Sequence, residues 1–210
     1  MAANSPFVVP TDSRELANAE LRRNPLYTRF PDGRKEWYIE QSLKLGTETA
    51  EQQLKRDDNI LRLLEGDGVE LIRKSGNDAN SPSALRSEIE FNANGSKILI
   101  YMDSVRSISE NSRKHAPHDL KLQEKGAFEM HVAHEYFHYL EFASGKTTSQ
   151  RLPRMEIPWL GKLKRRIEVR ETCEIAAQAF AMRFCGLSVL PTYYDLLLIE
   201  TRKNAGLITR

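Results

Sequence analysis

The sequence predicts an α+β fold, with a small three-stranded antiparallel sheet packed on a helical core. Residues 34–65 and 120–201 have helical patterns, whereas residues 69–102 hold short segments with strand-like patterns. The length of 210 residues suits one compact domain, and a content of 40% apolar and 29% charged residues is typical of globular proteins. We therefore expect a single domain over residues 34–210, preceded by an N-terminal arm over residues 1–33.

The first part of the chain is expected to be helical. Within an otherwise loosely structured arm, a short helix near Ser13–Asn24 ends at Asn24-Pro25, because a residue before proline disfavours helical backbone angles. A longer helical region follows over Arg34–Leu64, where apolar residues form an interrupted stripe. The sequence Gly66-Asp67-Gly68 is a stop signal for that region.

Three short segments are expected to form the sheet: Val69–Arg73, Glu88–Phe91 and Lys97–Met102. The first two alternate between apolar and polar residues, and the third is more continuously apolar. Residues 92–96 supply Asn and Gly for a hairpin turn between the second and third segments. Lys97–Met102 either presents its edge to an extended substrate or lies inside the sheet. Residues 75–83 and the polar segment Ser104–His118 are expected to be loops.

Helices are expected again after residue 120. They cover Leu122–Ala143, Arg165–Phe184 and Tyr193–Thr201, and a proline-containing connector over Ser144–Gly161 separates the first two.

The net charge and the lengths of the apolar runs indicate which partners and which compartment to expect. The net charge is only +2 and the basic residues are dispersed, so we expect no direct contact with nucleic acid. No segment approaches the roughly 18 apolar residues of a membrane span, and the N-terminus does not resemble a secretory signal. Cys173 and Cys185 lie on one expected helix, about 18 Å apart, which is too far for a disulfide. Together these features favour the cytoplasm.

The segment His134-Glu135-Tyr136-Phe137-His138 carries the main chemical signal. On a helix, His131, His134, Glu135 and His138 fall within about 100° of one another, opposite an apolar face. Histidines at positions i and i+4 can reach one tetrahedral Zn²⁺, and the glutamate between them can accept a proton from zinc-bound water. We therefore expect His134 and His138 to be zinc ligands and Glu135 to be the general base.

A third protein ligand is expected on the next helix, because a catalytic zinc usually has three protein ligands. The candidates are Glu168, Glu171 and Glu174. Glu174 shares a helix face with Gln178 among small alanines, which allow close helix packing, so it is preferred. Glu171 remains the main alternative, and Glu168 is expected on a solvated face.

These motifs resemble the ImmA/IrrE family of gluzincin-type metallopeptidases. The family pattern E-x-E-A-N-x-F-A is matched at Glu174, Ala177, Phe180 and Ala181, with Gln178 in place of the asparagine. The lead-in Met130–Glu135 is similar to the family's F-T-x-A-H-E. Phe137 stands where the family commonly has glycine, and Pro191 comes later than the family's terminal proline.

The resemblance implies a zinc endopeptidase with narrow, regulatory specificity in a bacterium or phage. Its substrate would be a protein such as a helix-turn-helix repressor or an antirepressor. A donor is also needed for the oxyanion. His131, Tyr194, Tyr193 and Arg183 are candidates; His131 and Tyr194 are our predicted catalytic residues, although His131 suits a structural role equally well. The alternatives are a non-proteolytic zinc-containing binding module and a zinc-protease toxin.

Overall fold

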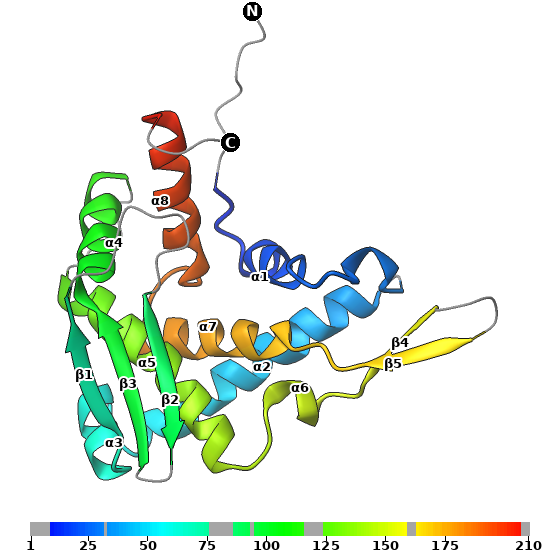
Figure 1. Ribbon diagram of the computed structural model, residues 1–210, viewed down its shortest axis with the longest axis horizontal. Coiled ribbons are helices and arrows are strands. Elements are labelled where there is room, and N and C mark those ends of the chain that lie inside the picture. The colour runs from blue at the N-terminus through cyan, green and yellow to red at the C-terminus, as the bar shows by residue number, and fades with distance from the viewer. Residues whose placement is uncertain are drawn as a thin grey trace, which may run out of the picture.

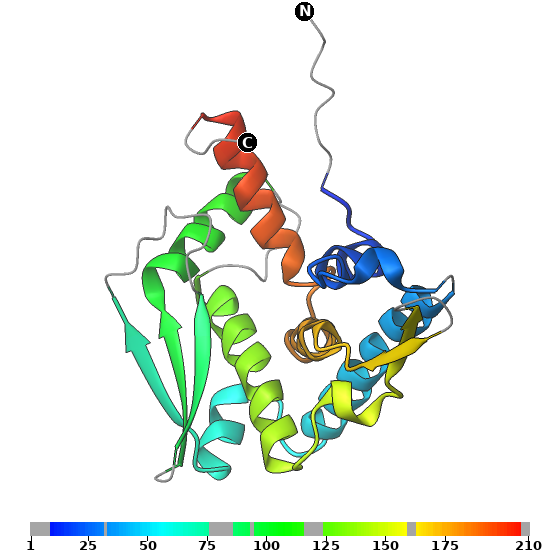
Figure 2. The same ribbon diagram turned by 45° about the vertical axis from the view of Figure 1, so that its right-hand side comes forward.

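The computed structural model describes residues 9–31, 33–75, 86–92, 95–115, 124–158 and 163–206. It is an α+β structure in which a three-stranded sheet covers one side of a group of helices (Figure 1). Helix α5 packs on the sheet, and α7 lies between α5 and α2 (Figure 2). Residues 159–161 of the predicted connector Ser144–Gly161 lie outside the described residues, as do residues 76–83 of the loop predicted over residues 75–83.

The first helices pack more closely than an arm would. They are α1 (Ser13–Leu21), the short 3-10 turn η1 (Tyr27–Arg29), α2 (Arg34–Leu54) and α3 (Ile60–Gly66). Asp12 caps α1 by accepting hydrogen bonds from two backbone N–H groups. Leu16 and Leu21 are completely buried, and α1 contacts both α2 and α7. The predicted helix near Ser13–Asn24 is confirmed, and it packs against other helices of the fold.

The predicted helical region Arg34–Leu64 is divided into two helices. Asp57 accepts a hydrogen bond from the Asn59 backbone at 2.7 Å, and Asn59 in turn caps α3 by accepting one from Leu61 N at 3.0 Å. Short polar side chains stabilise such turns by bonding to the local backbone. The chain therefore changes direction between α2 and α3.

The sheet contains β1 (Glu70–Lys74), β2 (Ser87–Asn92) and β3 (Gly95–Tyr101). Its order is β1-β3-β2; β1 and β3 are parallel, whereas β2 and β3 are antiparallel. The predicted antiparallel sheet is thus wrong, because β3 lies between β1 and β2 and runs parallel to β1. Lys97–Tyr101 is central rather than an edge, and Ile98 and Ile100 are completely buried.

Helix α4 (Met102–His115) occupies the segment that was expected to be a loop. Val105 and Ile108 are fully buried, but the rest of its buried face is polar, with Ser104, Ser109 and Ser112 against the neighbouring helices. Small hydroxyl side chains allow close packing, and they leave few apolar residues to mark the buried face in the sequence. The helix was missed for that reason.

The remaining elements include an unexpected hairpin. They are α5 (Glu124–Ala143), α6 (Thr148–Arg151), β4 (Met155–Pro158), β5 (Lys164–Ile167), α7 (Glu171–Cys185) and α8 (Thr192–Asn204). Strand β5 takes the residues predicted as the start of the helix Arg165–Phe184. There, Glu156 on β4 pairs across the hairpin with Arg166, Nε to Oε1, at 2.9 Å. The predicted helices Leu122–Ala143 and Tyr193–Thr201 agree with α5 and α8 within the described residues.

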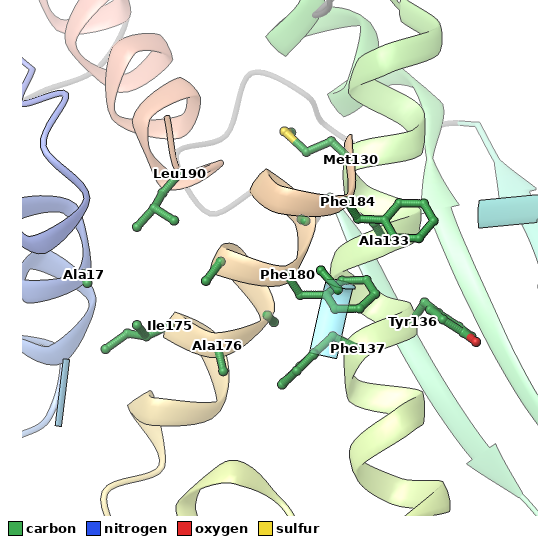
Figure 3. Close-up of a cluster of buried hydrophobic side chains, with 14 of the residues drawn as sticks. Ala17, Met130, Ala133, Tyr136, Phe137, Ile175, Ala176, Phe180, Phe184 and Leu190 are labelled. Carbon is green, nitrogen blue, oxygen red and sulfur yellow. The ribbon is translucent and has the colours of Figure 1, made fainter. Parts of the chain in front are cut away.

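In the core, α7 contacts α5 through aromatic side chains, and its backbone lies close to that of α2. Phe180 of α7 lies beside Phe137 of α5, with ring centroids 5.6 Å apart (Figure 3). On the other side of α7, Gly46 of α2 faces Ala176: an ideal Cβ at Gly46 would lie 2.1 Å from the Ala176 carbonyl oxygen. The small residues of α7 therefore permit its closest approach to α2. Within the described part of the chain, no helix has the length and apolar character needed to cross a membrane.

Candidate metal centre

Three side chains from α5 and α7 converge at one point. His134 and His138 lie one turn apart on α5, and Glu174 lies in the first turn of α7. The His134 Nε2–Glu174 Oε2 distance is 3.3 Å and the His138 Nε2–Glu174 Oε1 distance is 3.4 Å. One potential ligand atom from each residue lies within 4.8 Å of the others, so the group could hold a metal ion.

The spacing and chemistry of these atoms fit a tetrahedral cation. Metal–ligand bonds of about 2.0–2.1 Å, as for zinc, at tetrahedral angles place neighbouring ligand atoms about 3.3–3.4 Å apart. Each oxygen of the Glu174 carboxylate lies at this distance from one of the two imidazole nitrogens. Two imidazoles and a carboxylate would supply three ligands, and the Glu174 side chain is 45% exposed, so a fourth position would be open to the cavity.

The structure distinguishes among the three candidate glutamates. The Glu171 carboxylate accepts a hydrogen bond from Asn24 Nδ2 at 2.8 Å, and it does not belong to the converging group. Glu168 precedes α7 and accepts a hydrogen bond from Ser149 Oγ at 2.6 Å, so its placement on a solvated helix face is wrong. Of the three, Glu174 alone faces the histidines.

Glu141 contacts the His138 ring at Nδ1, the nitrogen that does not face Glu174. Its Oε2 atom lies 3.2 Å from His138 Nδ1, and its Oε1 atom accepts a hydrogen bond from the Thr148 backbone at the start of α6. Burial lowers the pKa of His138, but hydrogen bonds with Glu141 and Glu174 outweigh that effect and raise the pKa to about 10. Burial raises the pKa of Glu174, whereas the hydrogen bonds with His134 and His138 bring it below its ordinary value. Without metal, the site therefore holds a carboxylate–imidazolium pair.

Replacement of Glu141 by alanine is expected to weaken metal binding about 10–100-fold, because a carboxylate behind a ligating histidine fixes its orientation and raises its basicity. Competition with a chelating dye measures the change. Glu129→Ala, on the same helix but paired with Lys125, is the control and should bind metal as the wild type does. Equal affinity of the Glu141 variant and the wild type would contradict this role.

Glu135 lies beside the metal group without belonging to it. The residue is 6% exposed, and its Oε1 atom accepts a hydrogen bond from Ser87 Oγ at 2.7 Å. Ser87 opens β2, so the edge strand of the sheet fixes the orientation of this carboxylate. Glu135 and the three converging residues line one cavity of about 520 Å³. A carboxylate in this position can exchange a proton with a group bound at the metal.

The other predicted catalytic residues are in different environments. His131 lines the same cavity, and burial lowers its pKa to about 4, so the imidazole is neutral. Tyr194 is completely buried and is not among the residues that line the cavity. Tyr193 lines a separate cavity, and Arg183 pairs with Glu51 at 3.2 Å on the surface. Of these four, His131 alone reaches the site.

Several residues of the cavity had not been predicted. Arg86 precedes β2, and its Nε atom donates to Asp195 Oδ1 of α8 at 2.9 Å. Glu20 from α1 is 5% exposed and accepts a hydrogen bond from Arg23 at 3.0 Å. These residues come from distant parts of the sequence and have no local motif. Glu141, by contrast, stands three positions after His138 and could have been found from helical spacing.

Comparisons of the chain with protein-family models, curated proteins and solved structures give no match.

Proposed function

We propose that this protein is a zinc-dependent endopeptidase whose metal is held by His134, His138 and Glu174. The observation that supports this most strongly is the buried Glu135 carboxylate, held by Ser87 in the same cavity as the three converging side chains. A purely structural metal site has no need of such a carboxylate. This favours a hydrolase over a binding module.

Zinc bound there would supply Lewis acidity, which activates water for attack at neutral pH. The Glu135 carboxylate would accept a proton during that attack and pass it to the leaving amine. The Ser87 hydrogen bond to Oε1 keeps the carboxylate oriented for both transfers. Glu141 keeps the His138 imidazole turned towards the metal position.

An extended substrate would bind along β2. Among the described strands, β2 pairs with β3 alone, so its other side is a sheet edge. Ser87, Glu88 and Ile89 line the cavity, which brings this edge beside Glu135. An extended peptide can add to such an edge through backbone hydrogen bonds. This role replaces the one considered for Lys97–Met102.

The substrate is proposed to be a regulatory protein, such as a helix-turn-helix repressor or an antirepressor. The motifs around His134 and Glu174, which resemble those of ImmA/IrrE metallopeptidases, support this narrower proposal.

The Glu135→Gln variant tests the function. Loss of the proton acceptor is expected to slow hydrolysis about 10²–10⁴-fold while zinc content stays at the wild-type level. Zinc-loaded proteins would be incubated with a proteome-derived peptide library, and new amino termini would be counted by mass spectrometry. Glu129→Gln, on the same helix, is the matched control. Cleavage by the Glu135 variant at the wild-type rate would overturn the proposal. So would a zinc-loaded wild type that cleaves neither this library nor purified candidate repressors.

A further inference from the structure

At one end of the metal cavity, two buried nitrogen atoms have no hydrogen-bond partner among the residues that the structure describes. They are Arg86 Nη1 and His131 Nε2. Both residues line the cavity, and His131 is only 6% exposed. A buried donor without a partner has lost its hydrogen bonds to water without replacing them, so native structures rarely keep one without a functional reason.

Helix α8 borders the same end of the cavity. Pro191, Thr192 and Asp195, at the amino-terminal end of this helix, are among the lining residues. Asp195 Oδ1 accepts the Arg86 Nε hydrogen bond at 2.9 Å, which orients the guanidinium and leaves Nη1 for another acceptor. The amino-terminal end of a helix carries a partial positive charge and favours an anion.

The carboxylates already present in the cavity do not satisfy these nitrogen atoms. Glu135 accepts a hydrogen bond from Ser87, Glu20 accepts one from Arg23, and Glu174 faces the two histidines. Glu88 accepts a hydrogen bond from Tyr101 Oη at 2.5 Å. Among the described residues, none of these carboxylates bonds to either nitrogen atom, so a ligand can supply the missing acceptor.

We infer that Arg86 and His131 form a subsite for a carboxylate of the bound peptide. A guanidinium remains charged at any accessible pH and donates through a planar fork that suits a carboxylate. The second carboxylate oxygen would accept from His131 Nε2. The inference rests on the proposed peptidase function, since it assigns part of the substrate to the same cavity.

The position of His131 limits where the carboxylate can stand. His131 lies one helical turn before Glu135, a rise of about 6 Å along α5. An extended chain advances about 3.3 Å per residue. The carboxylate is therefore expected within about two residues of the cleaved bond, either as an acidic side chain or as the C-terminus of the peptide.

Binding of small probes to the full-length protein tests the subsite without any cleavage. N-acetylglutamic acid α-amide carries only a side-chain carboxylate, N-acetylalanine only a terminal one, and N-acetylglutamine amide none. Titrations are followed through the Arg86 Nε–H resonance, first without metal and then with zinc. We expect at least one of the two carboxylates to shift this resonance and to bind about tenfold or more tightly than the neutral amide. The better of the two identifies the source of the carboxylate.

Variants assign the binding to the two residues. Arg86→Gln is expected to weaken binding of the preferred probe about tenfold or more, and His131→Asn should weaken it less. Arg183→Gln, which removes a surface arginine paired with Glu51 outside the cavity, should bind as the wild type does. Equal binding of the charged and neutral probes by the wild type would overturn the inference, whether or not the variants fold. So would unchanged binding by a folded Arg86 variant. Because no bond is cleaved, these outcomes are independent of the Glu135 test.

Discussion

Replacement of Glu174 by alanine is expected to reduce zinc affinity roughly a hundredfold or more, so that the purified variant contains little metal. Structural zinc sites have apparent binding free energies of about 10–16 kcal/mol, or roughly 3 kcal/mol for each of four ligands. Glu174 is the carboxylate that lies 3.3 Å and 3.4 Å from the two histidines, so its loss leaves two protein ligands. Elemental analysis and competition with a chelating dye measure the loss.

Glu171→Ala is the matched control for that experiment. The two glutamates lie on the same turn of α7, but Glu171 bonds to Asn24 rather than facing the metal group. Its removal should leave the zinc content unchanged and cost at most the hydrogen bond to Asn24, about 1 kcal/mol of stability. Full zinc in the Glu174 variant, or loss of zinc from the Glu171 variant, would reverse the assignment of the third ligand.

Replacement of Gly46 by alanine is expected to destabilise the fold by several kcal/mol. The added Cβ would lie 2.1 Å from the Ala176 carbonyl oxygen and 2.9 Å from the Ala179 Cβ, so α2 and α7 would have to separate. Effects above about 4 kcal/mol are exceptional for one substitution, but a clash between the backbones of two core helices belongs in that range. Because α7 carries Glu174, metal affinity should fall as well.

The urea midpoint and the melting temperature measure this effect. Gly66→Ala provides the control, because a Cβ at the end of α3 meets no atom within 4 Å. That variant should be as stable as the wild type or slightly more stable, since alanine restricts the unfolded chain. A Gly46 variant with wild-type stability would contradict the close crossing of α2 and α7.

Local periodicity was sufficient to predict the helices that carry the candidate site. The spacing of His134 and His138 places both on one face of a helix, and Glu174 could be preferred over Glu171 from its neighbours alone. Glu171 is held away from the two histidines by a hydrogen bond from Asn24, which is distant in the sequence. The sequence therefore suggested the third ligand but could not show why its rival is excluded.

The sheet and α4 were predicted less well for physical reasons. Whether β1 pairs with β2 or with β3 depends on the path of the connection between them, which no strand pattern encodes. Helix α4 buries serines such as Ser104 and Ser112, so its apolar stripe is too narrow to be recognised. The hairpin of β4 and β5 has a similar explanation, since the basic run Lys164–Arg166 is compatible with an exposed helix until its pairing with Glu156 is known.

The residues that line the cavity were the hardest part of the site to predict from the sequence. A helical pattern shows which face Tyr194 occupies, but not that this face meets the core rather than the site. Arg86 just before β2, Ser87 on β2 and Asp195 on α8 reach the cavity through contacts that are distant along the chain. Such residues become candidates for function only when the fold brings them together.

The most direct test of the metal centre is to locate zinc by anomalous diffraction in crystals of the full-length protein grown with the ion. We expect one ion at about 2.0–2.2 Å from His134 Nε2, His138 Nε2 and an oxygen of Glu174, with Glu135 close by but not bonded to it. The Glu171 side chain should remain with Asn24. Absence of an ion between α5 and α7, or an ion bound at other residues while these three stay uncoordinated, would contradict the account.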